Sequence, residues 1–128
     1  MLMPKIRVHI ENTRKKNELF HVTRERWDAA CARHRALAGK LGSSVGWDGD
    51  MLEDALKEAD ILIGVPGRRE RLAERAPKLR WVHVTSAGVD PFLPLDWLPP
   101  GAVMTNSRGV HGPKEVHAVF VDSLDGPA

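Results

Sequence analysis

The stretch DILIGV, residues 60–65, constrains the fold of this chain more than any other segment. It is a short apolar run, and residues typical of turns flank it. A run of this length without polar alternation is typical of a strand that is buried on both faces, as in parallel sheets covered by helices. We therefore expect a β-strand over 60–65, inside a parallel sheet.

Strand and helix patterns alternate along the rest of the chain. β-rich segments predict further strands over 5–10, 43–47, 79–86 and 102–107. Apolar residues at three-to-four spacing predict one helix that is capped by Thr23 and ends at Gly42. They predict another that begins near Asp50, whose spacing from Glu53 resembles a capping box. A short helix should end before Pro77, and a further helix should begin at Pro113. This alternation predicts an α/β domain over 1–128 with right-handed crossovers.

The bulk composition excludes several classes of protein. Lys and Arg total 19 against 17 Asp and Glu, and the two signs are interleaved, which indicates solvated helix surfaces and no nucleic-acid partner. The single cysteine, Cys31, excludes an internal disulfide and a Cys-based zinc site, and its apolar helical spacing predicts a buried thiol. No apolar run approaches the roughly 18 residues that span a membrane, and no segment resembles a signal peptide. We expect no membrane association and a cytoplasmic location.

Three predicted loops meet at one edge of the expected sheet. They contain GVPGR, TSAGVD and TNSRGVHG, and each follows the carboxyl end of a predicted strand. Ligands of open α/β sheets bind beyond the carboxyl ends of the strands, where small residues let backbone N–H groups approach a ligand. Any one of these loops is explained by the needs of a turn, but three at one edge favour a binding site.

Other chemical signatures are missing from the sequence. It contains neither G-x-G-x-x-G nor G-x-x-x-x-G-K-[ST], so we do not expect this chain alone to bind a dinucleotide. The histidines show no metal-ligand spacing, and His9 and His83 fit core or edge positions of strands. His111 lies in a glycine-flanked loop, where a ligand contact and a local hydrogen bond are both open. The serines lack a G-x-S-x-G context.

The segment from Ala59 to Pro113, with LRWVHVTSAGVD and TNSRGVHGP, resembles the substrate-binding domain of the D-isomer-specific 2-hydroxyacid dehydrogenases. Together with the alternation, the resemblance implies a flavodoxin-like three-layer sandwich with five parallel strands in the order 2-1-3-4-5. In that family a second, Rossmann domain holds NAD or NADP. The resemblance implies that the carboxylate of a small 2-keto or 2-hydroxy acid binds the loop at Ser86, Ala87 and Gly88 through backbone N–H groups, with Arg68 reaching the substrate.

The chain also departs from the family pattern. The family's catalytic arginine, acid and histidine lie on or beside the cofactor domain, and no position here matches them. We therefore expect a truncated member that neither binds NADH nor turns over 2-keto acids by itself, so that its status as an enzyme is open. A stand-alone module that binds small carboxylates and an inert flavodoxin-like interaction domain are the alternatives.

The predicted last helix lacks the elements that would cover it in the family. Val116, Val119, Phe120 and Val121 are apolar at spacings that suit a helix. Large apolar surfaces are rarely left bare on a monomer, and a twofold dimer is the commonest way to cover one. We expect a homodimer through 113–124; the alternative is a monomer in which this helix folds back on its own sheet.

Overall fold

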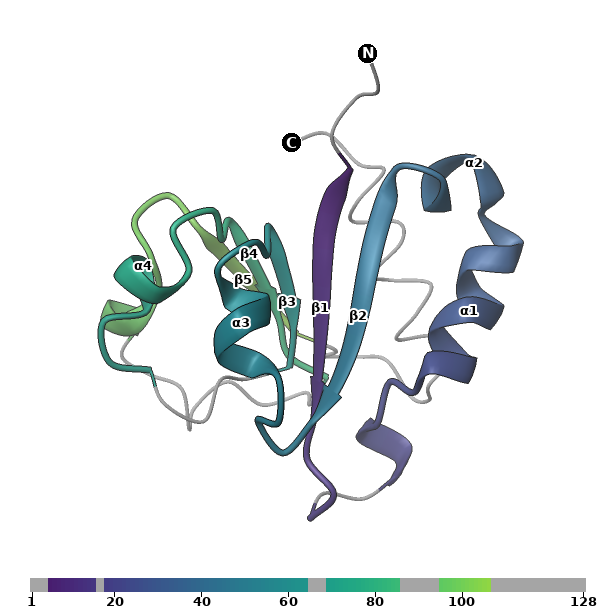
Figure 1. Cartoon of the computed structure of the whole chain (residues 1–128), viewed down its shortest axis with the longest axis horizontal. Helices are drawn as coiled ribbons and strands as arrows, with labels where there is room; N and C mark the ends of the chain where they lie inside the picture. Colours follow the sequence, from purple (N-terminus) through teal and green to yellow (C-terminus); the bar gives the residue numbers. More distant parts are fainter. Residues whose placement is uncertain (1–4, 16–17, 65–68, 86–94, 107–128) are drawn as a thin grey trace.

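A computed structural model describes residues 5–15, 18–64, 69–85 and 95–106, and its five strands form one parallel sheet (Figure 1). The strands are β1 (Ile6–Asn12), β2 (Leu41–Trp47), β3 (Ile61–Ile63), β4 (Trp81–His83) and β5 (Val103–Thr105). Their order is β2-β1-β3-β4-β5, and every neighbouring pair is parallel. The predicted α/β fold of flavodoxin-like type, with strand order 2-1-3-4-5, is confirmed.

Helices cover both faces of this sheet. They are α1 (Arg24–Arg33), α2 (Arg35–Ala38), α3 (Leu52–Leu56) and α4 (Leu72–Arg75), with 3-10 turns η1 (Glu18–Phe20) and η3 (Leu95–Trp97). Figure 1 shows α1 and α2 on one side of the strands and α3 and α4 on the other. None of the helices in the described ranges combines the length and the apolar character that crossing a membrane requires.

The side chains of alternate strand residues pack into two separate hydrophobic cores, one on each face of the sheet. On the α1 side the strands contribute Val8, Ile10, Ile61, Ile63 and Trp81, which pack with Val22 and Trp27. On the α3 side they contribute Leu62 and Val82, which pack with Leu52, Leu56 and Leu72. Because successive strand side chains point to opposite faces, a sheet buried on both faces needs apolar residues at successive positions. This explains why β3 is apolar throughout, and all three of its residues are buried.

The strand β3 is shorter than the predicted 60–65 because both flanking residues have other roles. The carboxylate of Asp60 accepts a hydrogen bond from the backbone N–H of Arg7 at 2.9 Å, which links the residue before β3 to β1. Gly64 has a φ of +112°, which is outside the extended region and ends the strand.

The first helix begins as predicted and ends early. The Thr23 hydroxyl accepts a hydrogen bond from the Arg26 N–H at 3.1 Å, as an N-cap should. The prediction that this helix continues to Gly42 is wrong, since α1 ends at Arg33, α2 is a separate turn, and Gly42 lies inside β2 opposite Arg7. Seven residues of β2 pair with β1, and this pairing outweighs the helical periodicity of the segment.

Two further expectations need correction. Cys31 packs against the first core but is only partly buried, and burial together with the charge of Asp28 raises the pKa of its thiol. Asp50 does not cap a helix. Its carboxylate accepts a hydrogen bond from the Trp47 N–H at 3.0 Å, and α3 begins after Met51 without a side-chain cap. The Asp50 carboxylate is therefore used in the turn between β2 and α3 and does not accept from an N–H at the start of α3.

Replacing Thr23 by alanine should lower the free energy of unfolding by about 1 kcal/mol, because the Arg26 N–H loses its acceptor at the start of α1. Thr23→Ser keeps a hydroxyl at the same place and should retain most of this stability. Urea unfolding followed by circular dichroism measures both variants. Equal losses in the serine and alanine variants would show that the cap bond is not the cause.

Candidate functional site

The carboxyl ends of β3, β4 and β5 lie on one rung of the sheet. Ile63 is in register with His83, and His83 is in register with Thr105. Backbone pairing continues one residue further, since the Gly64 N–H donates to the His83 carbonyl at 2.8 Å and the Val84 N–H donates to the Thr105 carbonyl at 2.9 Å. Gly64, Val84 and Asn106, the residues directly after these strands, therefore lie at one edge of the sheet, where the sequence predicts a site.

The predicted site residues Arg68, Ser86, Ala87, Gly88 and His111 lie outside the described residues, as does the predicted dimer segment 113–124. The neighbouring Arg69 is described. Its guanidinium lies 5.5 Å from the centre of the Trp97 ring, in cation–π geometry. Arg69 therefore packs against η3, which assigns it a structural role in this part of the molecule.

The winding of the sheet reverses between β1 and β3, because β2 lies on one side of β1 and all later strands lie on the other. Such a reversal is the usual place for a ligand crevice in open α/β sheets. Glu11 and Gly64 lie here, at the carboxyl ends of β1 and β3. A Cβ at Gly64 would overlap the Glu11 carbonyl oxygen and stand 3.3 Å from its carbonyl carbon. Only glycine lets the two backbones approach this closely.

A buried polar group lies at the ends of β4 and β5. The Thr105 hydroxyl accepts a hydrogen bond from the Trp81 indole N–H at 2.7 Å and lies 2.6 Å from His83 Nδ1. Burial lowers the pKa of His83 to about 4, so the ring is neutral at neutral pH. The Thr105 hydroxyl can then donate to Nδ1, which leaves the ring proton on Nε2. Of the core and edge positions predicted for His83, the structure shows the core position.

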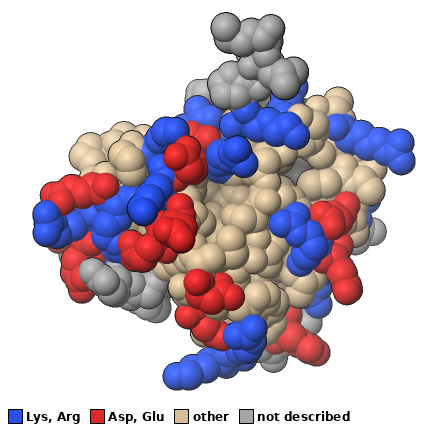
Figure 2. Space-filling model, in the orientation of Figure 1, with Lys and Arg blue, Asp and Glu red and all other residues tan. Residues whose placement is uncertain are grey.

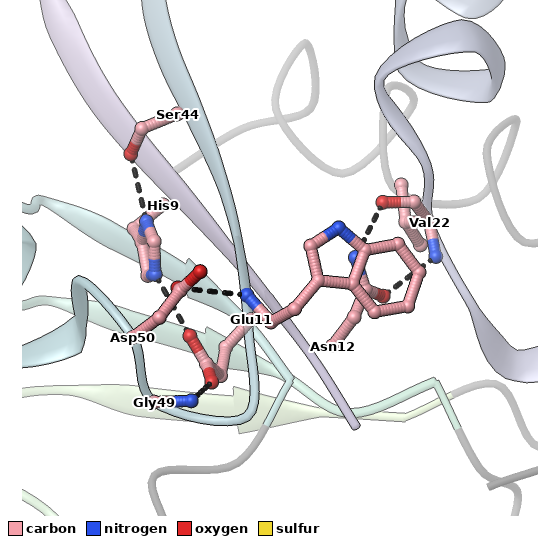
Figure 3. A network of polar contacts seen from close by, with 8 residues as sticks. His9, Glu11, Asn12, Val22, Ser44, Gly49 and Asp50 are labelled. Carbon is pink, nitrogen blue, oxygen red and sulfur yellow. Dashed lines mark hydrogen bonds and ion pairs between the residues drawn. The ribbon is translucent and has the colours of Figure 1, made fainter. Parts of the chain in front are cut away.

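A second polar network runs along the other face of β1 and continues into β2, as Figure 3 shows. The His9 ring bridges two partners, with Nδ1 at 2.7 Å from Ser44 Oγ and Nε2 at 3.0 Å from Glu11 Oε1. The other carboxylate oxygen of Glu11 accepts a hydrogen bond from the Gly49 N–H at 2.6 Å. The His9 residue is 1% exposed and the Glu11 side chain is 5% exposed. The prediction of a hydrogen-bonded core His9 is confirmed.

Sequence reasoning missed Ser44 and Glu11. The spacing of His9 and Glu11 carried part of the signal, since residues two apart on a strand share a face. Ser44 carried none, because its place beside His9 depends on the register of β1 against β2. That register is a property of the folded sheet and is not visible in either strand alone.

Asn12 closes the end of β1 with two hydrogen bonds. Its side-chain N–H donates to the Val22 carbonyl at 2.9 Å, and its side-chain oxygen accepts from the Val22 N–H at 2.9 Å. The turn after β1 is therefore occupied by a side chain that is bonded to the protein's own backbone. Elsewhere in the described ranges, no group of three His, Cys, Asp or Glu side chains is placed to hold a metal ion.

No protein-family model matches this chain, and neither a curated protein nor a solved structure matches it.

Proposed function

We propose that this chain is a substrate-binding domain of the D-2-hydroxyacid dehydrogenase type, which binds the carboxylate of a small 2-keto or 2-hydroxy acid at the carboxyl edge of its sheet. The observation that supports the proposal is that β3, β4 and β5 end in register with one another. The sequence segments with GVPGR, TSAGVD and TNSRGVHG therefore begin at the ends of neighbouring strands. Two described residues, Gly64 and Asn106, border this edge.

The proposed ligand contacts are the backbone N–H groups of Ser86, Ala87 and Gly88, with the Arg68 guanidinium as a second contact. Hydrogen bonds from N–H groups to a carboxylate are charge-assisted and stronger than those between neutral groups. Small residues in TSAGVD leave the backbone accessible to such an anion. Recognition through main-chain groups also explains why no charged side chain stands within this sequence motif before Asp90.

The residues at the first strand do not fit a dinucleotide. A dinucleotide-binding turn needs glycines between the first strand and the following helix, so that the pyrophosphate can reach the helix N-terminus. Here Asn12 is bonded to Val22, and the buried carboxylate of Glu11 stands beside it. We therefore assign NAD or NADP to a separate domain of the proposed enzyme, and no hydride transfer to this chain alone. The cytoplasmic location belongs to the same proposal.

Titration of the 15N-labelled chain with glyoxylate and pyruvate tests the proposal. We expect amide shifts centred on Ala87 and Gly88, with dissociation constants of about 1 mM, because a two-to-three-carbon anion makes few contacts. Pyruvamide has the same shape without the charge and should shift these amides little. Arg68→Ala should weaken binding by about tenfold. Arg71→Ala is the matched control, since Arg71 is already paired with Glu74 at 2.6 Å.

Two results would contradict this function. Equal binding of pyruvate and pyruvamide would show that the carboxylate is not recognised. Shifts that cluster away from the carboxyl edge, with Ala87 and Gly88 unchanged, would place the anion elsewhere on the chain. A module that only binds carboxylates would give the same shifts. A 340 nm assay with NADH should show no reduction of the ligand by this chain, and turnover would contradict the assignment of NAD or NADP to a separate domain.

A further inference from the structure

A groove of about 220 Å³ lies over the sheet beside α3, away from the carboxyl edge. Residues of β1, β2 and the α3 segment line it, among them Arg7, His9, Ser44, Ala55 and Ala59. Figure 2 shows mostly uncharged surface over β1 and β2, with lysine, arginine and acidic side chains around it. Sites for drug-sized ligands have volumes of roughly 300–1,000 Å³, so this smaller groove suits a smaller ligand.

Ser44 and His9, which line this groove, form with Glu11 a chain of hydrogen bonds from a hydroxyl to a buried carboxylate (Figure 3). The Gly49 N–H donates to one carboxylate oxygen of Glu11, and His9 Nε2 lies 3.0 Å from the other. In one of the two neutral tautomers of His9 the ring proton is on Nε2, and the Glu11 carboxylate accepts it. In the neutral ring, Nδ1 is then the acceptor, and it lies 2.7 Å from Ser44 Oγ.

We propose that Ser44 is a nucleophile, with His9 as its general base and Glu11 as the group that orients His9, and that the groove accepts short-chain carboxylic esters. A nucleophile in hydrogen-bond contact with a base, whose other side is fixed by an acid, is the arrangement that activates serine. Ser44 is partly exposed and lines the groove, whereas His9 and Glu11 are buried. This site does not depend on the carboxylate site at the sheet edge.

The reaction needs no reagent beyond the ester and water. Ser44 Oγ attacks the ester carbonyl carbon while its proton passes to His9 Nδ1, and Glu11 stabilises the imidazolium through the Nε2–H bond. Collapse of the tetrahedral intermediate breaks the bond to the leaving alkoxide, which takes the proton from Nδ1 and departs as an alcohol. Water then attacks the acyl group with the same base, releases the acid and restores Ser44 with its proton.

Arg7 is the group best placed to stabilise the oxyanion of that intermediate. It lies on the same face of β1 as His9, and it is in register with Gly42. A Cβ at Gly42 would stand 3.2 Å from Arg7 Nη1, so the glycine leaves room for the guanidinium over β2. Within the described ranges Arg7 forms no salt bridge, and its charge helps to lower the pKa of Glu58 at the same groove. A cation held beside the reacting carbonyl in a partly desolvated groove lowers the energy of developing negative charge.

Ala55 and Ala59 form the small-residue wall of the groove, while Glu58 also borders it and is engaged elsewhere. Lys78 Nζ lies 3.0 Å from the Glu58 carboxylate, and this ion pair lowers the pKa of Glu58. The wall therefore offers short aliphatic contact and no competing base. Acetyl and propionyl esters fit this lining better than long acyl chains.

Reaction of the intact chain with diisopropyl fluorophosphate tests the nucleophile. Ser44 Oγ forms a bond to phosphorus, fluoride leaves, and the proton passes to His9. We expect one adduct per chain, located at Ser44 by peptide mass spectrometry. No adduct should form when the reagent is added to the chain unfolded in urea. Ser44→Ala should reduce labelling at least ~100-fold, the usual contribution of an activated nucleophile and its base. Ser43→Ala is the matched control, because the Ser43 hydroxyl lies on the opposite face of β2 from Ser44 and accepts a hydrogen bond from Arg24 Nη1 at 2.9 Å.

Hydrolysis of p-nitrophenyl acetate provides the second measurement, with the folded state of each variant checked by circular dichroism. Hydrolysis should fall to the background rate in Ser44→Ala and stay within about twofold of the parent in Ser43→Ala. A folded parent chain that forms no adduct, an adduct at another residue, or equal hydrolysis by the Ser44→Ala variant would each overturn the proposal. Carboxylate binding at Ala87 and Gly88 should be unchanged in Ser44→Ala, so this test and that of the carboxylate site fail independently.

Discussion

Gly64→Ala is expected to lower the free energy of unfolding by about 3 kcal/mol, which for a domain of this size removes a large part of its stability. Two penalties add here. The backbone has a φ of +112°, which residues with a Cβ rarely adopt. The new methyl group would also overlap the Glu11 carbonyl oxygen, so β1 and β3 would have to separate at the switch point. Urea unfolding measures the loss.

Gly49→Ala is the matched control for this variant. Gly49 also has a positive φ, of +80°, but nothing lies within 4 Å of the Cβ that the substitution adds. It should therefore lose only the backbone part, about 1 kcal/mol. Equal losses at Gly49 and Gly64 would show that the close approach of Gly64 to Glu11 contributes nothing to stability.

Acidification is expected to destabilise the domain through His83, by about 3 kcal/mol at pH 4 relative to pH 7. Burial lowers the pKa of His83 from 6.5 to about 4. Above pH 6.5 the ring is neutral in both the folded and the unfolded chain, so His83 adds no pH dependence there. As the pH falls below 6.5, His83 binds a proton in the unfolded chain. In the folded chain it binds that proton only near pH 4. The stability of the neutral, buried ring is lost across this window.

The effect of His83 is measured as a difference between two proteins in how steeply the free energy of unfolding changes with pH. Unfolding free energies of the parent and of His83→Leu are compared between pH 7 and pH 4, since carboxylates also titrate in this range and contribute to both proteins. The parent should lose about 3 kcal/mol more than the variant. Parallel slopes in the parent and His83→Leu would contradict a buried neutral His83.

The two proposed sites share β1. Its carboxyl end supplies Glu11, whose carbonyl oxygen is packed against Gly64 and whose carboxylate holds His9. Gly64 borders the proposed carboxylate site, and His9 belongs to the proposed nucleophile site. We expect substitutions that displace β1 to affect both sites, and substitutions such as Ser44→Ala to affect one.

Local patterns were sufficient for much of the fold. The run DILIGV predicts a strand buried on both faces, and β3 is buried at every residue. Alternation of strand and helix patterns predicts a parallel sheet, and together with the family resemblance it predicts the order 2-1-3-4-5, which is confirmed. Thr23 is recognisable as a cap because its hydroxyl acts within three residues. Each of these inferences depends on contacts between near neighbours or on burial of a continuous segment. Both can be recognised in the sequence from the residue types and their spacing.

The sequence by itself therefore determined the fold class, the strand order and the start of the first helix, together with the expectation of a ligand at the carboxyl edge. Only the tertiary structure decided that Gly42 belongs to β2, that Asp60 and Gly64 cut β3 to three residues, and that Ser44 lies beside His9. These outcomes depend on the register of one strand against another. A shift of one residue in that register would turn Ser44 to the opposite face, and no pattern within 41–47 records which register the folded sheet adopts.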